Sequence, residues 1–171
     1  ASKEMVAATV RTIFAQANPE ATRAQLREVV GILERQFPKA AETLVLDRDL
    51  RLVGITGARY HAPLISCLES LEAIRAAKAR QLRVTCGVSV NHLVLSDTDV
   101  APWRSFFKVR PPLRGKQDRE AMVEGVAKGE IDVIVSKNSG GSATYAKIEA
   151  ARELDLPVIM IARPDKLAGH V

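Results

Sequence analysis

The sequence predicts an α/β fold: an N-terminal helical hairpin, then an open, mostly parallel sheet of four or five strands with crossover helices. Residues 1–40 carry two apolar stripes at helical spacing, and after residue 60 short β-branched runs alternate with helical segments. Strands that alternate with helices form parallel sheets with right-handed crossovers. A closed barrel of this kind needs eight strands, so the expected sheet is an incomplete barrel. The expected domains are a helical hairpin over residues 1–40 and an α/β domain over residues 46–171.

The composition is that of an ordinary α/β chain. Of the 171 residues, 47% are hydrophobic and only 4% aromatic, so the core must consist of aliphatic side chains. The net charge of +5 permits an acidic partner, but the basic residues are dispersed and no specific nucleic-acid binding is expected. The two cysteines, Cys67 and Cys86, imply no disulfide framework. No apolar run is long enough for a membrane span and no signal peptide is visible, so we expect a cytoplasmic protein that does not contact membranes.

Two amphipathic helices with a short connection are expected at the N-terminus. Ser2 is a candidate cap for a helix over residues 3–16. Asn18 followed by Pro19 is the start signal of a second helix, because the N–H that proline lacks is not needed in a first turn. Residues 40–49 are either a short linker or the start of another helix. The apolar stripes are Val6, Val10, Ile13 and Phe14 on the first helix and Leu26, Val29, Val30 and Leu33 on the second.

The segments MVAATVRTIFAQ (residues 5–16) and LERQFPK (residues 33–39) resemble the helical region of a Mutator-type insertion-sequence transposase. The resemblance covers residues 1–44. Such transposases hold metal ions with separated catalytic acids, which would lie outside this stretch, so the resemblance transfers no site. The apolar faces of these helices must be buried against each other and against another surface. We therefore expect the N-terminal helices to bind a protein partner.

The middle and end of the chain read as strand–helix units. Ser66 and Glu69 form a capping-box pattern for the first helix of this region, and Gly129 ends the second. Strands are expected at residues 60–65, 82–90, 105–109, 131–135 and 156–162, and helices at residues 67–80, 114–128 and 143–154.

Four segments within residues 46–136 resemble dihydroorotases: GARYH (57–61), EAIRAAKAR (72–80), VTCGVSVNHL (84–93) and KVRPPLR (108–114). The resemblance implies the later strands of an amidohydrolase-type (β/α)8 barrel. Metal-dependent members open the dihydroorotate ring with a metal-bound hydroxide. Their early His-x-His metal motif would precede this region, where the chain carries the helical hairpin instead.

The later metal ligands that this resemblance implies are also missing. Leu64 stands where many members have a metal-binding His, and Lys137 or Ser139 stands where the family has a late Asp. An ammonium group cannot replace a carboxylate ligand of a dication. Arg110 precedes the Pro-Pro-Leu-Arg turn where a small polar residue is usual. We therefore expect no dihydroorotase activity and no catalytic residue.

No other metal site is expected. The remaining candidate ligands match no compact zinc spacing; they are His61, Cys67, Cys86 and His92. Cys86 is expected to pack inside its strand as a small apolar residue, and His92 to lie in the loop after that strand.

The turn after the fourth strand is the best remaining local site. A Gly-Gly turn lets backbone N–H groups converge, the following helix adds a favourable dipole, and Lys137 adds charge. Two interpretations stay open: a site for a carboxylate, phosphate or nucleotide, or a plain turn whose glycines meet backbone geometry only. The residues of this turn are Lys137, Asn138, Ser139, Gly140, Gly141 and Ser142.

The segments KNSGGSATYAKIEAAREL (residues 137–154) and PVIMIARP (residues 157–164) resemble the C-terminal end of precorrin-6A reductase. That family reduces a corrin precursor with NADPH. The resemblance implies that residues 137–141 lie near an inter-domain cleft. The family's N-terminal nucleotide-binding half has no counterpart in the chain, so we expect no reductase activity and no cofactor.

The three resemblances together describe a chimera. We expect a non-enzymatic chimeric or generated protein that acts by binding a protein partner, for example as a neutralising or interaction module. The alternatives are a dihydroorotase-like amidohydrolase remnant and an anion- or nucleotide-binding module that uses the turn at residues 137–142.

Overall fold

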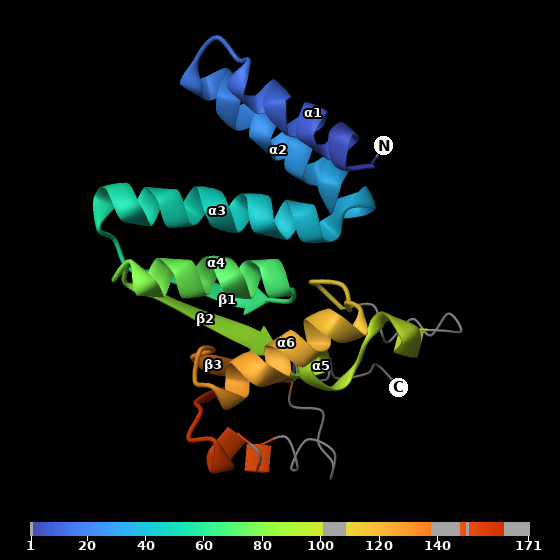
Figure 1. Ribbon diagram of the computed structural model, residues 1–171, viewed down its shortest axis with the longest axis vertical. Helices are drawn as coiled ribbons and strands as arrows, with labels where there is room; N and C mark the ends of the chain where they lie inside the picture. Colours follow the sequence, from blue (N-terminus) through green and yellow to red (C-terminus); the bar gives the residue numbers. More distant parts are fainter. Residues whose placement is uncertain (1, 101–108, 138–147, 150, 163–171) are drawn as a thin grey trace, which may run out of the picture. The chain divides into compact units, whose positions relative to one another are not determined.

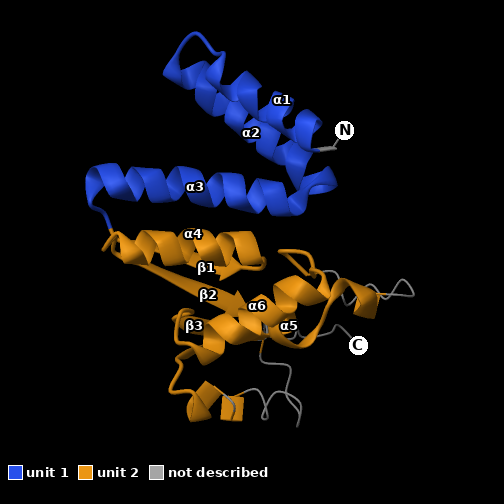
Figure 2. Ribbon diagram, in the orientation of Figure 1, with its two compact units in different colours: residues 1–58 blue, residues 59–171 orange. Residues whose placement is uncertain are grey.

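The computed structural model describes residues 2–100, 109–137, 148–149 and 151–162. The chain divides into two compact units, residues 1–58 and residues 59–171 (Figure 2). In the described part of the chain, no helix combines the length and the apolar character that crossing a bilayer would require.

Unit 1 consists of three consecutive helices, α1 (Ser2–Phe14), α2 (Pro19–Gln36) and α3 (Pro38–Thr56) (Figure 1). α1 packs on α2, and α2 packs on α3. Asn18 caps α2 as the sequence predicts, because its side-chain oxygen accepts the Ala21 N–H at 2.8 Å. All three helices contribute to the core of the unit, whose buried members are Ile13, Val29, Leu33 and Ala41.

The sequence allows residues 40–49 to be either a linker or a helix. They are helical, because they belong to α3, which continues unbroken to Thr56. Pro38 stands in its first turn, where the missing N–H costs nothing. Gly57 ends the helix in the left-handed region, with φ of 66°, and its N–H donates to the Val53 carbonyl at 2.8 Å. α3 thus belongs to unit 1, and the division between the units falls at residues 58 and 59 instead of residues 40 to 46.

Two details of α1 differ from the prediction. The helix begins at Ser2, so this residue is helical and is not the cap that precedes the helix. Phe14 is 78% exposed, whereas Ile13 beside it is 4% exposed. Successive residues are about 100° apart around a helix, so the orientation that buries Ile13 turns Phe14 toward solvent.

Unit 2 contains, in its described residues, an open sheet of four parallel strands that does not close into a barrel, as the sequence predicts. The strands, in spatial order, are β1 (Tyr60–Ile65), β2 (Val84–Ser89), β3 (Val133–Lys137) and β4 (Val158–Ile161). The helical elements are α4 (Leu68–Ala79), the short α5 (Val90–Val94), the 3-10 turn η1 (Asp97–Val100) and α6 (Lys116–Ala127) (Figure 1).

The core of unit 2 lies between the sheet and the pair α4 and α6, which pack side by side. Gly125 of α6 permits this close approach, because a Cβ at its position would lie 2.9 Å from Leu71 Cδ2. The largest fully buried side chains here are Leu71, Ile74, Val88, Met122 and Ile131.

Three elements of unit 2 differ from the prediction. Ser66 does not cap α4: the cap residue is Cys67, and the Leu68 N–H donates to Asp118 Oδ1 at 3.0 Å. α5 and η1 follow β2 where a loop is expected. Of the strand expected at residues 105–109, Val109 lies in no strand and residues 105–108 lie outside the described residues.

Strand β1 forms one edge of the described sheet. The Tyr60 N–H donates to the Arg83 carbonyl at 3.0 Å, so the N–H of residue 61 points away from β2. Pro63, further along β1, has no N–H to offer to another strand. The pairing register also shifts between Ala62 and Ile65.

Candidate functional site

The carboxyl ends of the parallel strands lie at one edge of the sheet, where open α/β folds bind ligands. Lys137 is the last residue of β3 and is exposed at this edge. Lys137 therefore belongs to the strand, whereas the sequence predicts it in the turn that follows. The other members of that turn, Asn138, Ser139, Gly140, Gly141 and Ser142, lie outside the described residues, so anion binding at this turn stays a prediction.

The residues that the dihydroorotase resemblance assigns to metal binding do not form a metal centre. Leu64 on β1 and Lys137 on β3 stand at the ligand-matching positions, and neither side chain holds a dication. His92 lies on α5 and not in a loop; it is 3% exposed, with Nε2 3.2 Å from the Pro112 carbonyl. Across residues 2–100, 109–137 and the short described stretches after them, no three His, Cys, Asp or Glu side chains are grouped to hold a metal ion. The donors present do not fit the family's metal centre, and no hydrolytic step follows from them.

The two cysteines are buried separately. Cys67 Sγ lies 3.2 Å from Ser70 Oγ. Cys86 is fully buried in β2, as predicted, and burial raises the pKa of its thiol to about 11. A thiol that stays protonated at neutral pH is a poor nucleophile, so Cys86 is a packing residue.

A buried polar cluster at the carboxyl end of β1 was not predicted. The Arg114 side chain is 6% exposed and donates from Nε to Ser66 Oγ at 2.8 Å. Asp118, also 6% exposed, accepts the Leu68 N–H that begins α4. These contacts fix the first turn of α6 against the junction of β1 and α4. The signal in the sequence is the arginine that ends the Pro-Pro-Leu-Arg turn.

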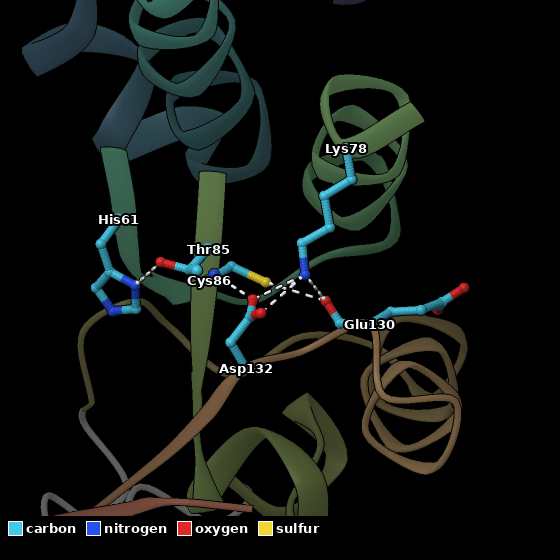
Figure 3. Close-up of polar contacts among 6 residues, drawn as sticks. All are labelled: His61, Lys78, Thr85, Cys86, Glu130 and Asp132. Atoms are coloured by element: carbon cyan, nitrogen blue, oxygen red, sulfur yellow. Dashed lines mark hydrogen bonds and ion pairs between the residues drawn. The ribbon is translucent and has the colours of Figure 1, made fainter. Parts of the chain in front are cut away.

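A second polar cluster joins α4 to the start of β3 (Figure 3). Lys78 Nζ lies 2.8 and 3.0 Å from the two carboxylate oxygens of Asp132 and 2.8 Å from the Glu130 carbonyl. The same Asp132 carboxylate accepts the Cys86 N–H at 2.8 Å. Arg75 donates to Glu130 at 2.6 Å, and this bond raises the pKa of the Arg75 guanidinium. The charges of this cluster are used to hold α4 to β3, so we assign it a structural role.

Large apolar side chains are exposed on the helices of unit 1. Leu52 and Ile55 of α3 are 53% and 81% exposed. Because they are three residues apart, they are neighbours on the surface of the helix. Phe14 at the end of α1 is exposed to a similar degree. Leu52 and Ile55 lie on α3, outside the helical hairpin of residues 1–40 for which the sequence predicts a partner, whereas Phe14 lies within it.

Comparison with curated proteins shows a likeness to dihydroorotases. The chain is 41% identical over 109 residues to the dihydroorotase of Lactobacillus johnsonii, an alignment that covers 64% of this chain and 25% of the relative. It is 40% identical over 103 residues to that of Halalkalibacterium halodurans, covering 60% of this chain and 24% of the relative. The chain thus spans about a quarter of the length of the curated relatives it matches.

The fold agrees with this likeness. A D-hydantoinase (dihydropyrimidinase) from Thermus sp. superposes with a TM-score of 0.56 and 26% identity, over 63% of this chain and 27% of that structure. The expected transposase character of residues 1–44 gains no support from these comparisons and stays a prediction.

A family model adds a second likeness. The model described as "Precorrin-6x reductase CbiJ/CobK" matches residues 70–171, so the match begins well before residue 137, where the sequence-based resemblance to a precorrin reductase begins. Likeness to two families within one chain is consistent with the predicted chimera. Because the model matches more than half of the residues, the chain belongs to the precorrin-6x reductase CbiJ/CobK family.

Proposed function

We propose that this chain is a non-enzymatic chimeric protein that binds a protein partner through its N-terminal helices. The observation that carries the proposal is Ile55, 81% exposed beside the half-exposed Leu52 on α3. Full burial of such a side chain contributes roughly 1.5–3 kcal/mol. Two neighbouring side chains can therefore supply a large share of a binding energy, and this is reason enough to test them as an interface.

The incomplete catalytic sets support a role without catalysis. Leu64 and Lys137 stand where the resemblance to dihydroorotases leads one to expect metal ligands. A reductase also needs a hydride donor such as NADPH. Residues 138–142 of the predicted glycine-rich turn lie outside the described residues. We therefore derive neither a hydrolytic nor a reductive step.

The test is site-specific photo-crosslinking in cells of the host that expresses the chain. A photoreactive phenylalanine analogue replaces Ile55 in one variant and Arg27, an exposed residue of α2, in a matched control. We expect one protein to crosslink from position 55 and not from position 27. That protein, once purified, should bind the wild-type chain and bind Leu52→Ser/Ile55→Ser at least tenfold more weakly. Identical crosslinking from both positions, or unchanged binding of the double variant, would refute the proposal.

A second candidate is a remnant of a dihydroorotase-like amidohydrolase, favoured by the 41% identity to the Lactobacillus johnsonii enzyme. This candidate requires activities that the binding module does not, because a working remnant must bind metal and open the dihydroorotate ring. Elemental analysis and a dihydroorotate assay separate the two candidates. About one metal ion per chain, with turnover that is lost on chelation, would favour the remnant over the binding module.

A further inference from the structure

Among the described strands, β4 has a neighbour on one side only. Its ladder with β3 continues without a shift of register along the whole strand. The Ile134 N–H donates to the Pro157 carbonyl at 3.0 Å, and backbone groups alternate in direction along a strand, so the N–H and carbonyl of Ile159 also point toward β3. The N–H and carbonyl groups of Val158 and Met160 therefore point outward, where a further strand can bind them.

The side chains of β4 are apolar and exposed on both faces of the strand. Side chains alternate between faces, so Ile159 and Ile161 lie on one face and Met160 on the other. These three side chains are 52%, 50% and 39% exposed, in that order. Edge strands usually carry a charged residue or a proline that prevents pairing, and the Val-Ile-Met-Ile sequence of β4 contains neither. Both the backbone and the side chains of this edge are thus suited to a further strand.

A second copy of β4 fits this edge in the antiparallel direction. If Ile159 lies opposite Ile159 of the second copy, Val158 lies opposite Met160 on both sides of a two-fold axis. The backbone groups of Val158 and Met160 point outward, so each of these pairs exchanges both N–H···O bonds. The two Ile159 residues then form a non-hydrogen-bonded pair, in which the Cα atoms are about 4.5 Å apart and the side chains are closest.

The charges near the ends of β4 favour this direction. Lys137 ends β3 beside Ile161 and is exposed, and Asp155 is exposed just before β4 begins. Antiparallel pairing brings the end of one β4 beside the beginning of the other. Lys137 of each copy then lies two strand spacings, on the order of 10 Å, across the sheet from the strand that follows Asp155 of the other copy. Opposite charges at about one Debye length attract each other, whereas parallel pairing would bring like ends together.

We propose that two copies of this chain associate through β4 in a symmetric antiparallel pair that joins their sheets. The occupant of the edge is a second copy because the strand is complementary to itself in backbone pattern, in apolar side chains and in charge. A contact of this length buries less than a standard interface, so the dissociation constant should be on the order of 100 µM. The proposal uses residues of unit 2 only and is therefore independent of the partner proposed for the N-terminal helices.

The experiment is sedimentation equilibrium of the full chain over roughly 10–1,000 µM, a range that brackets this constant. The test variants are Ile159→Lys and Ile159→Glu, measured separately and as an equimolar mixture. The matched control is Val123→Lys, which places the same charge on an apolar side chain of α6 that is 47% exposed, close to the 52% of Ile159.

We expect the wild type and Val123→Lys to dimerise with dissociation constants that agree within twofold. Each Ile159 variant alone should dimerise at least tenfold more weakly, because like charges then lie directly opposite each other across the two-fold axis. The mixture should regain a dimer, because Lys then faces Glu. This gain also shows that β4 is folded in both variants.

Three results would each overturn the proposal. The first is a wild-type chain that stays monomeric throughout the concentration range. The second is an Ile159→Lys variant that dimerises as the wild type does, or a control that loses the dimer equally, since the contact would then lie elsewhere. The third is a mixture that dimerises no better than either Ile159 variant alone, since position 159 would then not face its own copy.

Discussion

Replacement of Gly87 by alanine should destabilise unit 2, because β2 lies between two strands with no room for a Cβ at this position. A Cβ on Gly87 would lie 2.6 Å from the Pro63 carbonyl oxygen and 2.9 Å from Val133 Cγ1. Non-bonded carbon and oxygen atoms approach to about 3.3 Å. The Pro63 oxygen belongs to the backbone of β1, so no side-chain rotation relieves the clash and the strands must separate.

Overpacking of this kind costs about 1–3 kcal/mol, against a total stability of roughly 5–15 kcal/mol for a domain. Urea unfolding followed by circular dichroism measures the loss. Hydrogen exchange resolved by peptide then assigns it to residues 59–171. The matched control is Gly31→Ala in α2, where no atom lies within 4 Å of the added Cβ.

Gly31→Ala should stabilise unit 1 by about 1 kcal/mol, because alanine is the better helix former. The same substitution thus has opposite signs at the two sites. If Gly87→Ala were as stable as the wild type, or if both variants shifted in one direction, the steric reasoning would be wrong.

Three further predictions follow from the described contacts. Burial raises the pKa of Cys86 from 9.0 to about 11. The free energy of unfolding should therefore be constant below pH 9 and should fall by roughly 2–3 kcal/mol as the pH rises to 11, because the thiol ionises more readily in the unfolded chain. Cys86→Ala should remove this fall in a pH series of urea unfolding. Asp118→Ala removes the acceptor of the Leu68 N–H and should cost about 1–2 kcal/mol in a thermal melt, whereas Asp118→Asn should keep most of the stability; equal melting of all three proteins would contradict the capping role. A peptide of residues 1–37 should show no cooperative helical melt, since short helices are marginal in water, whereas residues 1–58, which include α3, should melt cooperatively by circular dichroism.

The strands were predictable because their signal is local. The run from Tyr60 to Ile65 gives β1 with the same bounds, and β2 lies inside the predicted run of residues 82–90. β3 begins two residues later than expected and ends two residues later, at Lys137. Gly129, with φ of 66°, lies just after α6, as its conformational freedom predicts.

The misses arise where distant residues compete with a local pattern. Ser66 and Glu69 have the spacing of a capping box. In the structure, however, the Ser66 hydroxyl accepts a hydrogen bond from Arg114, and the Leu68 N–H donates to Asp118. Those two side chains lie about fifty residues along the chain, so no local pattern announces them. α5 is only five residues long, which is too short for a helical period to show.

The candidate sites divide in the same way. The absence of a ligand at Leu64 and Lys137 can be read from the residue types alone. The cluster of Lys78 and Asp132 cannot, because it depends on the packing that places α4 beside the start of β3. These two residues lie 54 positions apart in the chain and become neighbours only when that packing is known.

The two edges of the described sheet differ, and this limits how copies of the chain can associate. A strand that approaches β1 meets Pro63, which has no N–H, and a local shift of register, so a regular ladder cannot form there. β4 contains no proline, and its Ile159 and Ile161 are about half exposed. If two copies pair through their β4 strands, the outer strand at each end of the joined sheet is β1, which cannot add a further strand. Sheet-to-sheet association through the described strands would therefore stop at a dimer and would not propagate into a fibre.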